Sequence, residues 1–222
     1  MRHVVLNLHG LGTPPGPLEP GEAPYWISPD LLRETLAIAR RHADRVQPRF
    51  TFDDSNRSDL EIGAPILAEA GHTATHFVLA ARLEAPHYLD AAALRELRGM
   101  GHGIGNHGAR HVDWTACDDA GLAAELHEAR DTIAAAAGAP VREAGIPFGR
   151  YDARVLRALR AAGYARAHTS DGGAVRGSPW LVPRTSLRAD MGPADIEAIL
   201  LGREPWPRKL RRRLSMAVKA RI

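Results

Sequence analysis

Short apolar runs alternate with amphipathic segments along almost the whole chain, and this alternation most constrains the fold. Such a pattern is typical of βα units, in which parallel strands are covered by helices. The strand-like runs cover residues 3–8, 49–52, 74–79, 103–106, 142–146, 165–169 and 181–187. They predict about seven strands in a parallel sheet or barrel.

Capping signals mark the helices between these strands. Ser28 followed by Pro29 is typical of a helix start, and apolar residues at helical spacing follow. Further helices are predicted over residues 58–69, 90–98, 118–137, 152–162 and 193–200. Glycines follow four of these segments, where a left-handed cap favours glycine: Gly71, Gly138, Gly163 and Gly202. Residues 10–25 hold five prolines and predict a long loop that walls a site beside the first strand.

Length and composition narrow the class of protein. The 222 residues are 45% hydrophobic, which suits one globular domain that we place at residues 1–206. Cys117 is the single cysteine, so an intramolecular disulfide and a cysteine-based zinc site are excluded. No apolar run reaches the roughly 18 residues of a membrane span, and the first residues lack the pattern of a signal peptide. We therefore expect a cytoplasmic protein.

The last residues, 207–222, form a basic tail. Seven basic groups and no acidic one lie in residues 208–222, which exceeds the net charge of +3 for the chain. The rest of the chain is thus net acidic, which argues against a nucleic-acid partner. Apolar residues interleave with the basic ones, so the tail is compatible with peripheral contact to an anionic membrane. A solvated last helix explains the same pattern.

Polar side chains cluster after several predicted strands, and the carboxyl ends of parallel strands meet at one mouth of a barrel. Asp53 and Asp54 follow the second strand, and His107 and His111 follow the fourth. The histidine spacing of four residues places both rings on one face of a helical turn. Alone, the aspartate pair is also compatible with a solvated turn, and the histidine pair with a chance spacing. Together they supply two imidazoles and a carboxylate, which are typical ligands of a catalytic divalent metal.

Three motifs in this order carry a family resemblance: TFDDSNRSD, then GHGIGNHGARHVDW, then AGIPFGRYD. They resemble the first three motifs of the polysaccharide deacetylases, carbohydrate esterase family four with the NodB homology domain. The resemblance covers nearly the whole chain. It implies an α/β fold, a single-domain distorted (β/α)7 barrel of the NodB type, in agreement with the strand count.

The resemblance also assigns roles. It implies that Asp53 is the general base and that Asp54, His107 and His111 bind a divalent metal. Zinc is commonest in the family, and cobalt or nickel are accepted. The backbone N–H of Phe148 would help to hold the tetrahedral oxyanion.

Departures from the family pattern leave two roles open. Gly145 stands where many members have an arginine that orients the base, so Arg184 or Asn56 are candidates for that role. The general-acid histidine of the last motif is missing, which leaves His9 or His168 as the available imidazoles, with His9 preferred. Ser55 and Gly108 replace the usual glycine and hydroxyl residue. The residues expected to contact substrate are Asn56, Trp114, Pro147 and Arg184.

These features predict a metal-dependent hydrolase that removes N-acetyl groups from an amino-sugar unit of a polysaccharide or glycan precursor. Asp53 would take a proton from water while the metal polarises the acetamide. An O-acetyl esterase is the alternative within enzymes, since the same groups can attack an ester. A catalytically inactive saccharide-binding homologue is the alternative outside enzymes.

Overall fold

A computed structural model describes residues 1–175 and 177–203 and, in the C-terminal segment, residues 210, 214, 216–219 and 221. Most of the basic tail thus lies outside the described residues, and its contact with a membrane stays a prediction, as does the cytoplasmic location. Within the described residues, no helix is both long and apolar enough to cross a membrane.

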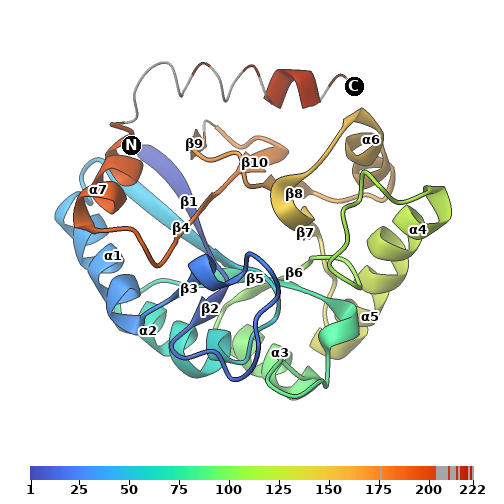
Figure 1. Ribbon diagram of the computed structural model, residues 1–222, viewed down its shortest axis with the longest axis horizontal. Helices are drawn as coiled ribbons and strands as arrows, with labels where there is room; N and C mark the ends of the chain where they lie inside the picture. The colour runs from blue at the N-terminus through green and yellow to red at the C-terminus, as the bar shows by residue number, and fades with distance from the viewer. Residues whose placement is uncertain (176, 204–209, 211–213, 215, 220, 222) are drawn as a thin grey trace.

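The main sheet is nearly closed into a barrel, with helices around its outside (Figure 1). Its order is β10-β8-β7-β6-β5-β4-β1-β11, all neighbours along this path being parallel, and β9 pairs antiparallel with β1. The strands are β1 (Arg2–Leu8), β4 (Val46–Phe52), β5 (Ala74–Val78), β6 (Gly103–Asn106), β7 (Glu143–Gly145), β8 (Arg166–Thr169), β9 (Ala174–Val175), β10 (Leu181–Pro183) and β11 (Thr185–Ser186). The predicted distorted barrel is confirmed.

The prediction of a single strand over residues 181–187 is wrong. This segment is divided into β10 and β11, which lie at opposite ends of the sheet order. β10 pairs with β8, whereas β11 pairs with β1, and only Arg184 stands between them. The chain therefore crosses from one edge of the sheet to the other at Arg184, which brings the two edges together and places this residue at the seam of the barrel.

The helices follow the capping signals of the sequence. Ser28 accepts a hydrogen bond from the backbone N–H of Leu31 at the start of α1, and Asp90, Asp118 and Asp152 cap α3, α4 and α6 in the same way. The helices are α1 (Pro29–Arg41), α2 (Ala64–Glu69), α3 (Ala91–Gly99), α4 (Asp119–Ala123), α5 (Ala129–Ala137), α6 (Ala153–Ala161) and α7 (Pro193–Leu201).

Shorter elements fill the connections. A two-stranded sheet of β2 (Gly10–Leu11) and β3 (Trp26–Ile27) frames the predicted loop over residues 10–25. The 3-10 helices are η1 (Ala23–Tyr25), η3 (Ala80–Arg82) and η5 (Pro147–Gly149), and the π-helical turns are η2 (Asp59–Gly63) and η4 (Ala124–Glu128). These turns precede α2 and α5, so the two long predicted helices, 58–69 and 118–137, exist but are not regular.

Apolar side chains pack in three clusters. The largest joins α1, α2 and α7 to β1 and β4, while the others lie under α3 with α5 and under α4 with α6. Burial of this apolar surface holds the helices against the barrel, at roughly 25 cal/mol per Å² removed from water.

Phe77 fills the middle of the barrel, and two glycines make room for it. The ring is fully buried. A Cβ added at Gly105 would enter the Phe77 ring and lie 3.1 Å from the carbonyl oxygen of Glu143. One added at Gly145 would lie 2.8 Å from Cγ of Phe77 and 3.2 Å from Nδ1 of His107. Glycine at both positions is therefore a packing requirement.

We expect Gly105→Ala to lower the free energy of unfolding by about 1–3 kcal/mol, because the methyl group meets an immobile ring and backbone. Gly99→Ala is the matched control, since a Cβ there meets nothing within 4 Å. Urea denaturation of both variants and the wild type measures the difference. Equal stabilities for the two variants would contradict the packing argument.

Candidate active site

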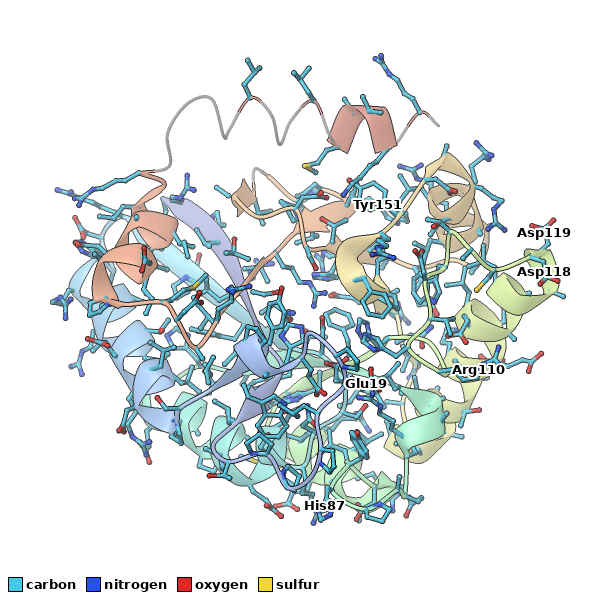
Figure 2. The ribbon with its side chains drawn as sticks, viewed as in Figure 1. Glu19, His87, Arg110, Asp118, Asp119 and Tyr151 are labelled. Carbon is cyan, nitrogen blue, oxygen red and sulfur yellow. The ribbon has the colours of Figure 1, made fainter. Side chains whose placement is uncertain are left out.

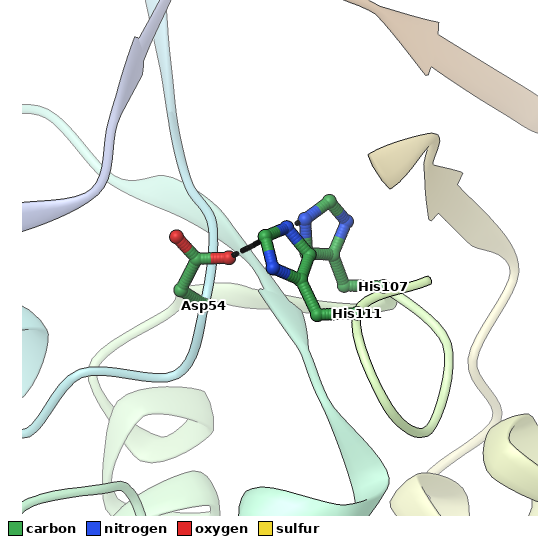
Figure 3. A group of neighbouring side chains, drawn as sticks. All are labelled: Asp54, His107 and His111. Atoms are coloured by element: carbon green, nitrogen blue, oxygen red, sulfur yellow. Dashed lines mark ion pairs between the residues drawn. The ribbon is translucent and has the colours of Figure 1, made fainter. Parts of the chain in front are cut away.

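Three predicted metal ligands converge at the carboxyl end of the barrel (Figure 3). Ligand atoms of Asp54, His107 and His111 all lie within 4.8 Å of one another. Oδ1 of Asp54 is 3.5 Å from Nε2 of His107 and 3.5 Å from Nε2 of His111. This Oδ1 is buried and has no hydrogen-bond partner. A cation between the three groups would satisfy it, and a carboxylate with two imidazoles is a donor set that suits a divalent transition metal.

The backbone around this cluster is held in unusual conformations. Asp54, Ser55 and His111 have positive φ angles of 73°, 65° and 55°, which cost energy in residues other than glycine. Ser55 is fixed from both sides: its hydroxyl accepts the N–H of Leu79 at 2.8 Å, and its carbonyl accepts the N–H of Leu89 at 2.8 Å. These contacts hold the turn that presents Asp54.

The prediction that His107 and His111 share a helical turn is wrong. Residues 107–111 form an irregular loop after β6. Gly108 has a φ of 89°, and a Cβ there would run into the carboxylate of Glu125. The loop reverses tightly at this glycine, so both imidazoles reach Asp54 without a helix.

His107 is oriented by a backbone carbonyl. Its Nδ1 lies 2.8 Å from the carbonyl oxygen of Gly145, which fixes the tautomer with the proton on Nδ1. Nε2 then carries the lone pair and faces Asp54. Burial lowers the pKa of the His107 ring below its usual value, which favours the neutral form that binds metal.

His111 has a carboxylate behind it that sequence reasoning missed. Nδ1 of His111 lies 3.8 Å from Oε2 of Glu19, and Oε1 of Glu19 accepts a hydrogen bond from Arg82 at 2.6 Å. Arg82 also donates to the carbonyl oxygen of Asp54 at 3.4 Å. Glu19 belongs to the loop over residues 10–25 and lies toward the middle of the molecule in Figure 2. The predicted wall of the site is therefore tied to one of its ligands.

Asp53 lies beside the ligand cluster in a network of buried donors. Arg184 approaches it with two nitrogens, at 2.6 Å from Oδ1 and 2.9 Å from Oδ2, and Asn7 donates to Oδ2 at 2.9 Å. Nε2 of His107 is 3.8 Å from the same Oδ2. Burial raises the pKa of Asp53, but the Arg184 guanidinium, with smaller effects from His107 and His9, outweighs it and holds the pKa well below its usual range.

The sequence left two candidates for the residue that orients Asp53, Arg184 and Asn56. In the structure Arg184 takes this role. The arginine is fully buried and also donates to Oδ1 of Asn7 at 2.8 Å. It is closed off from solvent, so the expected contact with substrate is wrong. Asn56 is buried as well and donates to the carbonyl oxygen of His9 at 3.4 Å, which makes it a support for the first loop rather than for Asp53.

The two candidate acids lie in different places. Nε2 of His9 is 4.0 Å from Oδ2 of Asp53, and its ring packs at 4.8 Å from that of Tyr25. His168 instead bonds to Glu143 through Nε2 at 2.8 Å, inside the barrel. Proximity to Asp53 therefore favours His9.

Residues after β7 line the other side of the site. Phe148 has a φ of 56°, the residue is 54% exposed, and its ring centroid lies 4.4 Å from that of His111. Pro147, the residue before it, is buried. Trp114 is fully buried in the cluster under α4 and α6, so its ring has no face open to a sugar and the expected substrate contact is wrong.

A buried acid behind the site was also missed. Asp59 is fully buried, and neither carboxylate oxygen has a hydrogen-bond partner. Burial raises its pKa well above the usual value, with further repulsion from Asp54 and Asp53. Nδ1 of His76 lies 3.8 Å from Oδ2 of Asp59, and Nε2 of His76 bonds in turn to His102 at 2.9 Å.

Comparison with known proteins identifies the chain. The family described as Polysaccharide deacetylase matches residues 47–167, a span that includes Asp53, Asp54, His107, His111 and Phe148. The chain belongs to the polysaccharide deacetylase family. It is therefore an enzyme of carbohydrate deacetylation, and an acetylated carbohydrate is its class of substrate.

Solved structures show the same fold at low sequence identity. The Streptococcus pyogenes deacetylase PplD, in complex with acetate, is 19% identical, with a TM-score of 0.76 over 92% of this chain and 99% of that one. A de-N-acetylase from Aggregatibacter actinomycetemcomitans is 14% identical, with a TM-score of 0.74 over 90% of this chain and 100% of that one. IcaB from Ammonifex degensii is 18% identical, with a TM-score of 0.70 over 90% and 97%. No curated protein matches the sequence.

The deacetylase is expected to bind metal less tightly when Glu19 loses its charge. Glu19→Gln removes the carboxylate that lies 3.8 Å from Nδ1 of His111, and because Glu19 is largely exposed we expect the lower end of the usual effect, about tenfold in metal affinity. Titration of Zn²⁺ against a competing chelator measures the Kd. Glu61→Gln is the control, because Glu61 is ion-paired to Arg57 on the surface. Equal Kd values for the two variants would show that Glu19 does not orient His111.

A pH-dependent change in stability is expected for Asp59→Asn. Burial raises the pKa of Asp59 in the folded protein, whereas the same carboxyl ionises in the unfolded chain above a pH of about 4, so stability is lost as the pH rises past that value. Asp59→Asn lacks this loss, so its gain in the free energy of unfolding over the wild type should grow as the pH rises above about 4. Urea denaturation of the metal-free proteins measures it, with Asp44→Asn at an exposed site as control. A gain that does not change with pH would contradict the neutral buried acid.

Proposed function

We propose that this deacetylase is a divalent-metal-dependent N-deacetylase that removes acetyl groups from an amino-sugar unit of a polysaccharide or glycan precursor. One observation carries the proposal: Asp54, His107 and His111 meet beside a second carboxylate, Asp53, which a buried arginine holds in place. Metal ligands and a separate base are the two elements that hydrolysis of a stable amide needs.

Asp54, His107 and His111 would hold the ion, which we infer to be zinc, with cobalt or nickel able to replace it. When bound, such an ion polarises a carbonyl and lowers the pKa of water. The orphaned Oδ1 of Asp54 and the fixed tautomer of His107 support this assignment. Three protein ligands leave positions open for water and substrate, as catalytic sites require.

Asp53 would accept the proton of the attacking water. Its Oδ2 lies 3.8 Å from Nε2 of His107, so it faces the region in which that water would lie. Arg184 and Asn7 keep the carboxylate ionised and prevent it from rotating into the metal-ligand position. A positioned base of this kind typically contributes about 10²- to 10⁴-fold to the rate.

The remaining roles fall to groups on two sides of this centre. His9 would deliver a proton to the departing amine, since its ring is next to Asp53. The backbone N–H of Phe148 would stabilise the oxyanion, and one such donor is commonly worth about 3 kcal/mol. The exposed Phe148 ring stands at the rim, where the apolar face of a sugar ring can pack against it.

Acetate release from N-acetylhexosamine oligosaccharides tests the proposal. Asp53→Asn should bind the metal as tightly as the wild type but lose at least about 10²-fold in kcat, because it removes the base and leaves the three metal ligands in place. His107→Ala should lose the metal itself. Turnover is measured by acetate released, and metal binding by titration.

Three outcomes would redirect the assignment. Full activity in either variant would remove the catalytic assignment. Faster release from O-acetylated than from N-acetylated saccharides would make the enzyme an O-acetyl esterase. Saccharide binding without turnover in the metal-loaded wild type would instead indicate an inactive homologue.

A further inference from the structure

The loop over residues 107–111 carries a candidate metal ligand at each end, His107 and His111. Their ring centroids lie 5.3 Å apart, so the course of the loop sets the geometry in which both imidazoles face Asp54. The loop belongs to no helix or strand, and it contains positive φ angles of 89° at Gly108 and 55° at His111. Since such a conformation costs energy at His111, contacts with the rest of the protein must hold the loop in shape.

A buried glutamate makes one of these contacts. Glu125 is 1% exposed, and its Oε2 accepts a hydrogen bond from the backbone N–H of Ala109, the middle residue of the loop, at 2.6 Å. Hydrogen bonds to a carboxylate are shorter and stronger than those between neutral groups. The carbonyl oxygen of Ala109 accepts the N–H of Ala81 at 3.0 Å. Both backbone polar groups of Ala109 are therefore bonded, one of them to a side chain.

Glu125 is held in turn by Asn106, the last residue of β6. Nδ2 of Asn106 donates to the backbone carbonyl of Glu125 at 2.9 Å and to the hydroxyl of Tyr164 at 2.7 Å. Its Oδ1 accepts the N–H of Gly108 at 2.8 Å. The end of the strand, the loop and η4, which carries Glu125, are thus joined by one buried network. A π-helical turn such as η4 is often found at a functional site.

The surroundings of Gly108 show how closely the carboxylate fits the loop. A Cβ at this position would run into Oε2 of Glu125 and would lie 3.2 Å from Nε1 of Trp114. The carboxylate therefore occupies space that any larger side chain at Gly108 would need. The glycine and Glu125 form a matched pair, because the first allows the close approach and the second bonds to the residue that follows the glycine.

Stability of the fold does not account for an acid at this place. Within the described residues, Oε1 of Glu125 is buried and has no hydrogen-bond partner. Nε of Arg110, an exposed side chain, lies 3.7 Å from it. Burial of a carboxylate with one unpaired oxygen costs free energy. Local rules of this kind are typically broken at functional sites, so the acid points to a role beyond packing.

We propose that Glu125 is a positioning residue for the metal ligands His107 and His111. The place of its Oε2, rather than its charge, fixes Ala109 and with it the separation of the two imidazoles. The proposal rests on the metal site of the proposed function, because metal affinity is one of its consequences. Glu125 acts through the loop and touches neither the ion nor the substrate.

Two substitutions separate the place of the oxygen from its charge. Glu125→Gln keeps an acceptor oxygen at the same reach but removes the charge, whereas Glu125→Asp keeps the charge but withdraws the acceptor by one methylene group. We expect Glu125→Asp to weaken Zn²⁺ binding by about tenfold or more, as loss of a group that orients metal ligands typically does. Glu125→Gln should bind Zn²⁺ nearly as tightly as the wild type. Competition with a chelator measures the Kd.

The visible absorption spectrum of the Co²⁺-loaded protein reports the geometry of the ligands directly. It should change in Glu125→Asp but not in Glu125→Gln, a difference that a role in stability alone would not produce. Glu128→Asp is the matched control, since this glutamate is exposed on the same turn, and its Kd and spectrum should equal those of the wild type. Urea denaturation checks that all three variants are folded.

Hydrogen exchange in the full-length, metal-free protein tests the loop without any ion. Amides of residues 107–111 should exchange faster in Glu125→Asp than in Glu125→Gln or the wild type. An unchanged Kd, spectrum and exchange rate in Glu125→Asp would overturn the proposal, and so would a larger loss of affinity in Glu125→Gln, which would assign the effect to charge. A wild type that binds no Zn²⁺ would overturn the metal site of the proposed function, whereas the exchange rates would still decide whether Glu125 holds the loop.

Discussion

The buried pair of Arg184 and Asp53 is the interaction on which both the closed sheet and the active site depend. Arg184 is placed at the seam because β10 and β11 belong to opposite edges of the sheet. Its guanidinium then spans the barrel to Asp53 and to Asn7 on β1. Loss of one partner from a buried ion pair typically costs about 3–5 kcal/mol, since the other charge is left without compensation. The contact between Arg184 and Asp53 therefore both helps to close the barrel and orients the carboxylate.

The same pair explains the departure at Gly145. Many members of the family have an arginine at this position, but here Phe77 and His107 occupy the space that any side chain would need. The carbonyl of Gly145 instead orients His107, and the guanidinium enters from the seam between β10 and β11. Phe77, the two glycines around it and Arg184 therefore pack as one unit. A larger side chain at either glycine would require Phe77 to move.

Periodicity and capping residues predicted the barrel well because they depend on local physics. Every predicted strand and helix has a counterpart, and the polar residues at strand ends converge at one mouth. The split at Arg184 could not be predicted, because a single residue changes the partner strand without changing the apolar pattern. Glu19, Arg82 and Asp59 were missed because their contacts join distant segments. The spacing of His107 and His111 suits a helix and a tight loop equally, and only the packing of Gly108 against Glu125 decides between them.

The layered interior of the barrel also determines how substrate must approach. Phe77 fills the middle, so an acetylated sugar reaches Asp53 only from the carboxyl end of the strands. There the loop over residues 10–25 and the exposed Phe148 ring flank the ligand cluster, and Glu19 ties that loop to His111. Movement of the loop would disturb the ligand as well as the opening. We therefore expect the geometry of the candidate metal site and access of the saccharide to be coupled through this loop.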